Sequence, residues 1–272
     1  MANNTLTMKQ SLTMQQSKSM EWSQITWDEI PAKLAAANFS AILPIGATEQ
    51  HGPHMGCGMD YVLADVLCKT VATKTQVPML PTMPYGCSIG HSQRWPGTIA
   101  LQPITLINMM KDMGDWAYHS GVRRLFIVNT HVTNAAPLRC ALEMLRAAHD
   151  DMMVAVFNTA HLSPRVKQFH HADGDDWHAN DAETSLMLAT APHMVRNHKL
   201  PLADDPDRTE NLVFSHPVNR TSTNGVTGTP SISTARKGEE WFDWMVEDLS
   251  VLIAKGTQET PPLAHSYFDG IA

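Results

Sequence analysis

The sequence predicts an α/β fold in which a mainly parallel central sheet is the middle layer of a three-layer sandwich. Apolar runs of strand length alternate along the chain with longer segments of helical periodicity. These short runs contain almost no polar residue, which is typical of parallel strands buried on both faces. With 272 residues, of which 43% are hydrophobic, the chain can also fill a substantial core. We therefore expect one layered domain with right-handed crossovers between its strands.

Each of the first three predicted strands is followed by a crossover helix. The three strand and helix pairs are residues 39–45 with 61–72, residues 78–83 with 104–119, and residues 125–129 with 135–148. A fourth strand is expected at residues 152–157, and further helices at residues 183–189 and 241–253. Ligands of open parallel sheets bind outside the carboxyl ends of the strands, so the residues after each strand are the first candidates for function.

Residues 1–20 are expected to form a flexible N-terminal arm. They are rich in Ser, Thr, Gln, Lys and Met and show neither a helical nor a strand period. Residues 21–272 then form a single α/β domain. Within it, residues 201–220 are predicted to be a long surface loop, and the hydroxyl-rich residues 219–233 to wrap either a subunit contact or a substrate.

The composition excludes several classes of protein. The formal charge is −7 and the longest basic stretch is Arg123-Arg124, so neither nucleic acid nor an anionic membrane is an expected partner. No apolar run approaches the roughly 18 residues of a membrane span, and the first twenty residues lack the apolar block of a signal peptide. The four cysteines show no zinc-finger spacing. We expect a cytoplasmic protein with reduced thiols.

The connection after the first strand carries candidate metal ligands. Glu49, His51 and Asp60 lie in one strand-to-helix connection that also contains three glycines. Imidazole and carboxylate together suit Zn²⁺ or Mn²⁺, and one carboxylate can bridge two ions through its two oxygens. The alternative is a glycine-rich turn in which Asp60 caps the following helix and His51 bonds to a carbonyl.

His131 repeats this pattern after the third strand. It lies in the polar segment Asn129-Thr130-His131-Val132-Thr133-Asn134. If the first and third strands are neighbours, His131 lies beside the first group of ligands, and two His-bearing strand ends favour a metal site. The alternative is that His131 caps the next helix, with Asn134 as its N-cap residue.

Two further polar segments are candidates for substrate contact and catalysis. Residues 86–98 follow the second strand and include His91 and Trp95, as a substrate-facing loop does; the sequence alone slightly favours an ordinary surface loop with Trp95 packed inward. Farther along, Asn180 followed by Glu183 is a capping-box pattern, so Glu183 is either a capping carboxylate or a side chain that points toward the metals. His178, just ahead of that helix, is the candidate proton shuttle.

These motifs together resemble the creatininase (creatinine amidohydrolase) family. The resemblance rests on Glu49-Gln50-His51-Gly52-Pro53-His54 with Asp60, on Asn-x-His-x-x-Asn at residues 129–134, and on His178-Ala179 followed by Glu183-Thr184-Ser185. It covers roughly residues 38–195. The resemblance implies a creatininase-like layered α/β domain, commonly assembled as a homohexamer, in which two divalent ions activate a water that opens a cyclic or linear amide.

The resemblance also implies a role for each matched residue. One ion is held by Glu49, Asp60 and His131, the other by His51 and Asp60, and His178 is the acid/base. The expected pocket residues are Ser88, Asp175 and Trp177 from the resemblance, with His91 and Trp95 from their loop and Val132 in the wall.

One departure from the family pattern concerns the second ion. The creatininase pattern at the third strand end is Asn-Gly-His-aromatic-Glu-Asn, whereas this chain has Thr133 in place of the anionic ligand, and many relatives carry Gly there. Glu183 is the predicted replacement ligand, which gives it a catalytic as well as a metal-binding role. Val132 removes an aromatic side chain from the pocket wall, so creatinine is an unsafe choice of substrate.

The predicted activity is metal-dependent hydrolysis of a C–N amide bond in a small molecule, with Zn²⁺ and/or Mn²⁺ as cofactor, two per subunit. One alternative is a metal-dependent lactone or enol-ring hydrolase on the same fold. The other is a non-catalytic binding or scaffold protein. Six candidate site residues occur together in the chain, and a scaffold has no need of all six, which argues against the second alternative.

Overall fold

The computed structural model describes residues 19–91 and 94–263. Its strands are β1 (Ser40–Ile45), β2 (Arg124–Asn129) and β3 (Met153–Asn158). Its α-helices are α2 (Ile30–Ala36), α3 (Met59–Thr75), α4 (Pro103–His119), α5 (Ala135–Ala148), α6 (Pro164–His170), α7 (Asp181–Thr190), α8 (Val218–Thr221) and α9 (Ala235–Gln258). Short 3₁₀ helices are η1 (Trp22–Gln24), η2 (Ile89–His91), η3 (Val132–Asn134), η4 (Thr159–His161), η5 (Pro192–Met194), η6 (Asn197–Leu202) and η7 (Pro230–Ile232). Residues 1–18 of the predicted N-terminal arm lie outside the described residues.

The three strands form a parallel sheet in the order β1-β2-β3. Ile45 pairs with Asn129, and Asn129 pairs with Asn158, so the carboxyl ends of all three strands lie level with one another. This register brings the polar segments after β1 and β2 to the same edge of the sheet, as the sequence predicts.

The predicted strand at residues 78–83 is wrong as a continuous strand, although the segment does lie along β1. Met79 and Met83 form isolated parallel bridges to β1, and hydrogen bonds run from Leu80 N–H to Ile42 O (2.8 Å) and from Met83 N–H to Pro44 O (3.0 Å). The rung between these two bonds is missing because Pro44 has no N–H to donate to this segment, and a step of three residues from Leu80 to Met83 faces a step of only two from Ile42 to Pro44, so the ladder is irregular there. On its far side this edge segment pairs with the start of the described chain, where Met79 N–H donates to Met20 O (2.7 Å).

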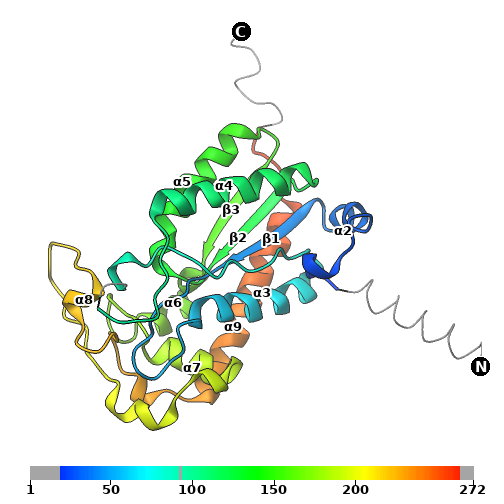
Figure 1. Ribbon diagram of the computed structural model, residues 1–272. Coiled ribbons are helices and arrows are strands. Elements are labelled where there is room, and N and C mark those ends of the chain that lie inside the picture. The colour runs from blue at the N-terminus through cyan, green and yellow to red at the C-terminus, as the bar shows by residue number, and fades with distance from the viewer. Residues whose placement is uncertain (1–18, 92–93, 264–272) are drawn as a thin grey trace, which may run out of the picture.

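Helices cover both faces of the sheet and complete the predicted three-layer sandwich. Helices α4 and α5 lie on one face, and α3 and α9 lie on the other (Figure 1). In β2 the side chains alternate accordingly: Leu125 and Ile127 pack in the α4/α5 layer, whereas Phe126 and Val128 pack in the α3/α9 layer. Of the helices in the described residues, none is long and apolar enough to cross a lipid bilayer.

Candidate metal centre

The carboxyl ends of β1 and β2 are held together tightly enough to place side chains from separate connections against one another. The start of α3 passes directly over Gly46, where an added Cβ would lie 2.3 Å from the Tyr61 nitrogen, so only glycine fits. Asn134 ties the strand ends together, because its Nδ2 donates to Gly46 O (3.0 Å) and its Oδ1 accepts from Cys87 N–H (2.8 Å). Asn134 precedes α5 but makes no side-chain capping bond, so the capping alternative does not hold for it.

Five buried ligand-type side chains meet at this edge of the sheet. Two groups each have ligand atoms within 4.8 Å of one another: Glu49, Asp60 and His131 form one, and His51, Asp60 and Glu183 form the other. Asp60 belongs to both groups. Its Oδ1 lies 3.5 Å from His51 Nε2 and its Oδ2 lies 3.3 Å from His131 Nδ1, which is the arrangement of a carboxylate that bridges two ions.

The inward atoms of this cluster match the donor set of a divalent metal. Both carboxylate oxygens of Glu49, Nε2 of His51 and Oδ2 of Asp60 are buried and make no hydrogen bond to any of the described residues. Buried polar atoms without partners are costly, and divalent ions held by the two groups would satisfy all four. Imidazole nitrogen and carboxylate oxygen are ligands that Zn²⁺ and Mn²⁺ accept, so these residues fit the cofactor that the sequence predicts.

Hydrogen bonds that the two rings donate to backbone carbonyls orient both histidines toward the cluster. Nδ1 of His51 lies 3.1 Å from Glu49 O, and Nε2 of His131 lies 3.0 Å from Cys87 O. A carbonyl oxygen only accepts, so these ring nitrogens carry the protons. The other nitrogen of each ring, which faces the carboxylates, therefore keeps its lone pair for a metal. The predicted bond from His51 to a carbonyl is confirmed, and it serves the cluster rather than replacing it.

Without an ion, the three carboxylates control the charge of the two histidines. Burial by itself lowers the pKa of His51, but the nearby carboxylates, Asp60 first, outweigh burial and raise the pKa to about 10. For His131, burial likewise lowers the pKa, while Glu49 and Asp60 raise it to about 9. The cluster therefore attracts positive charge, and binding of a divalent ion is coupled to the release of protons from these rings.

Glu183 takes part in the cap of α7 and also lies against the cluster. Asn180 Oδ1 accepts from Glu183 N–H (3.1 Å), which confirms Asn180 as the N-cap of α7. Glu183 Oε2 accepts from the N–H of Ala179 (2.6 Å), the residue before the N-cap. The same Oε2 lies 3.9 Å from His51 Nε2. Burial, only partly offset by His51, raises the pKa of Glu183 to about 7.

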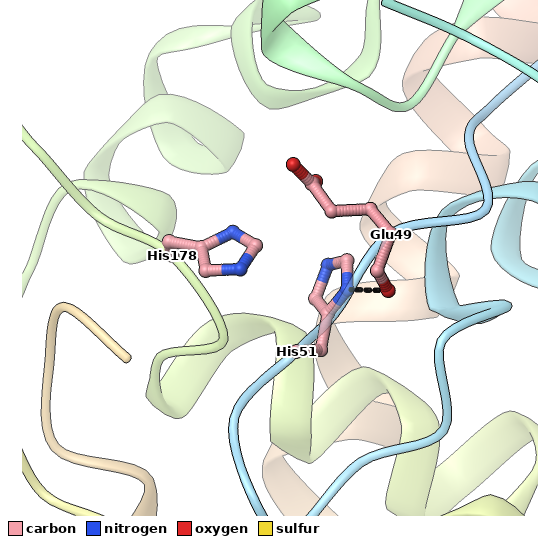
Figure 2. Close-up of side chains that lie close together, drawn as sticks. All are labelled: Glu49, His51 and His178. Atoms are coloured by element: carbon pink, nitrogen blue, oxygen red, sulfur yellow. Dashed lines mark hydrogen bonds between the residues drawn. The ribbon is translucent and has the colours of Figure 1, made fainter. Parts of the chain in front are cut away.

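His178, which lies just before α7, faces His51 and Glu49 (Figure 2). Its ring centroid lies 4.5 Å from that of His51 and 4.4 Å from that of His91. Its backbone is held by two hydrogen bonds to Thr227, and its Nε2 lies 2.8 Å from Gln50 O. Burial, together with His91 and His51, lowers the pKa of His178 well below its usual range, so the ring is neutral.

A cavity of about 410 Å³ opens above the cluster and is lined by most of the predicted substrate residues. Those in its wall are His91, Val132, Asp175 and Trp177. Ser88 and Trp95 do not line it. Ser88 is buried beneath His131, with its Oγ 3.1 Å from His131 Nε2, so it supports the His131 ring. Trp95 is half-buried and lies under the guanidinium of Arg94.

The sequence did not indicate several residues that the structure brings to the cavity. Residues 215–218 line it from the long connection that was predicted only as a surface loop. Asp176 also lines the cavity, and it lies in the segment from Asp175 to His178 that the resemblance places in the pocket. No local pattern marks residues 215–218, because tertiary folding alone brings them there. His91 was predicted as a pocket residue, and it also approaches the cluster, because its Nδ1 lies 3.0 Å from Glu49 Oε1.

Comparison with known proteins places this arrangement beside one family. The family model of creatininase, described as creatinine amidohydrolase, matches residues 23–253. Creatinine amidohydrolase of Pseudomonas putida is 31% identical over 263 residues, covering 90% of this chain and 99% of that protein. The mycofactocin precursor peptide peptidase of Mycobacterium ulcerans (strain Agy99) is 31% identical over 233 residues, covering 80% and 86%. A mutant creatininase structure of the "Zn-Zn type" aligns with a TM-score of 0.78 at 28% identity, covering 89% of this chain and 99% of that one.

Proposed function

The chain belongs to the creatininase family and is a metal-dependent amide hydrolase, and from that premise we propose that it cleaves a C–N bond of a small amide with two Zn²⁺ or Mn²⁺ ions. Glu49, Asp60 and His131 hold one ion, and His51, Asp60 and Glu183 hold the other. The observation that carries this proposal is the set of buried inward atoms that lack hydrogen bonds. The "Zn-Zn" description of a related structure supports a pair of ions.

In the proposed mechanism His178 carries the proton from the attacking water to the departing nitrogen. When bound, the ions supply a water whose pKa is lowered toward roughly 7 and polarise the carbonyl oxygen. Because His178 Nε2 donates to Gln50 O, its Nδ1 is the nitrogen free to accept a proton. As the water oxygen bonds to the carbonyl carbon and the C–N bond breaks, this proton passes to the nitrogen, which is too basic to leave as an anion.

The walls of the cavity favour a neutral or cationic substrate. Outside the metal ligands its charged side chains include the carboxylates of Asp175 and Asp176, and none of its described lining residues is a lysine or arginine. Oδ2 of Asp176 is buried without a hydrogen-bond partner among the described residues, so it is free to accept from a substrate N–H group. A substrate carrying a carboxylate here would meet repulsion from both aspartates.

A substrate screen separates amide from ester chemistry at this site. The metal-loaded enzyme is offered cyclic amides, linear amides and matched lactones, and the release of an amine or the opening of the ring is followed. Turnover of amides with little lactone opening supports the proposal. Preferential lactone opening favours the ring-hydrolase alternative, and turnover of neither, in a fully loaded protein, favours a binding role.

We expect protein purified without chelator to contain about two divalent ions per chain. Ions that bind the folded chain alone stabilise it by mass action, so chelation should lower the melting temperature and added Zn²⁺ or Mn²⁺ should restore it. Elemental analysis and thermal unfolding of the same sample measure both effects. Absence of bound metal, together with no gain in stability on adding it, would exclude the metal centre.

We also propose that the protein is a cytoplasmic homohexamer. The family resemblance supports the hexamer, and all six residues of the edge strand β3 are only half-buried although five of them are apolar or aromatic. The exposed residues Leu212, Val213 and Phe214 offer further apolar surface. The four free cysteines suit a reducing compartment.

Sedimentation velocity at micromolar protein concentration should show one species with six times the mass of the chain. Closed homo-oligomers bury apolar surface that a monomer leaves in water. A stable monomer under these conditions would contradict the assembly while leaving the metal centre untouched.

A further inference from the structure

Two histidines face each other outside the metal centre, where η4 and the end of α6 meet. His161 is the last residue of η4, and His171 directly follows α6. The intervening residues bring the two rings back together, with ring centroids 5.4 Å apart and a tilt of 60° between the planes. Their Nε2 atoms are 3.4 Å apart.

This separation suits two ligands of one ion better than it suits a hydrogen bond. An N–H group usually lies about 2.9–3.0 Å from its acceptor, so 3.4 Å is a long bond between two imidazoles. Two zinc–nitrogen bonds of about 2.0–2.1 Å at the tetrahedral angle place the nitrogens about 3.3–3.4 Å apart. The two side chains therefore already have the spacing that a tetrahedral ion requires.

An exposed carboxylate lies near one of these ligands. Asp175 Oδ1 lies 3.5 Å from Nδ1 of His171, which makes no hydrogen bond to any of the described residues. The carboxylate therefore adds a weak, solvent-screened attraction for a cation at the pair and does not fix the ring. His161 is neutral near pH 7, since burial, followed by His171 and Lys167, lowers its pKa.

Other charged or basic groups around the pair limit how strongly it can bind. The ammonium group of Lys167 opposes a cation near His161. The ring of His170 packs against Phe169 and Trp177, and no third histidine, cysteine or carboxylate of the described chain completes a three-ligand group here. Water must fill the remaining positions, so affinity should be lower than at the buried centre.

We propose that His161 and His171 form an outer site for one ion of the Zn²⁺, Ni²⁺ or Cu²⁺ class. The site lies at the rim of the catalytic cavity, because the His171 ring contacts Trp177 (5.8 Å between centroids) and Asp175 lines the cavity wall. An ion there would join the end of η4 to the residue that follows α6. The inference is independent of the proposed substrate.

The test counts ions on the metal-loaded enzyme. Wild-type protein, with its centre already filled, is dialysed against micromolar Zn²⁺ or Ni²⁺, and bound metal is measured by elemental analysis. We expect one further, weakly held ion per chain, which His161→Gln and His171→Gln each remove while the ions of the centre stay bound.

His198→Gln is the matched control, because it removes an exposed histidine elsewhere on the surface. This control should bind the further ion as the wild type does. Nitrogen hyperfine structure from two imidazoles in the electron paramagnetic resonance spectrum of added Cu²⁺ should likewise disappear only in the two site variants. A further ion that persists in both variants, or that the control also loses, overturns the proposal, as does the absence of any further ion in wild type.

Discussion

Glu183→Gln is expected to remove about one ion per chain and to abolish turnover. Glu183 is the carboxylate that joins His51 and Asp60 in the second ligand group. Thr133 stands where the creatininase pattern has Glu, and it offers only a hydroxyl. A neutral amide of the same shape is a much weaker ligand for a divalent ion than a carboxylate. Elemental analysis and kcat of the purified variant measure the two effects.

The capping role of Glu183 makes a control variant necessary. Loss of a helix cap costs about 1 kcal/mol of stability whether or not metal is bound. Asn180→Ala removes the N-cap bond that Glu183 N–H donates to Asn180 Oδ1, and leaves the carboxylate in place. We expect this control to lose stability but keep both ions. Full metal occupancy in Glu183→Gln with only a modest drop in melting temperature would show that Glu183 is a cap and that one ion suffices.

Much of the fold could be predicted because apolar periodicity reports burial directly. β1 and β2 read as unbroken apolar runs, and they are buried on both faces between helices. The segment at residues 78–83 is equally apolar, yet its hydrogen bonding to β1 is irregular, because Pro44 of β1 has no N–H to donate to it. The apolar composition of such a segment indicates that it is buried. Its hydrogen-bonded pairing with a neighbouring strand depends instead on which residues have an N–H group that faces that strand.

The centre of the site could be predicted for a different reason. Glu49, His51 and His131 directly follow two strands, and parallel register brings such positions together without further information. Ser88 and residues 215–218 depend instead on how loops cross the end of the sheet. Ser88 comes to lie under His131, and residues 215–218 reach the cavity from a distant connection, so neither position follows from local sequence.

Replacement of His178 by Ala should lower kcat by about 10²- to 10⁴-fold, the usual contribution of general acid–base catalysis, without loss of metal. The ring is held in place, because Thr227 hydrogen-bonds to its backbone and its Nε2–H donates to Gln50 O. A neutral imidazole with a low pKa accepts a proton only transiently and gives it up readily, which suits delivery to a departing nitrogen.

The position of His178 also allows a role other than proton transfer. His178 forms a group with Glu49 and His51 whose ligand atoms lie within 4.8 Å of one another, so a ligand role is a real physical alternative to proton transfer. His178→Gln, which keeps a polar side chain of similar reach but cannot carry a proton at neutral pH, should resemble His178→Ala in kcat and retain both ions. If either variant loses an ion, His178 binds metal; if both retain wild-type kcat, the proton must travel by another route.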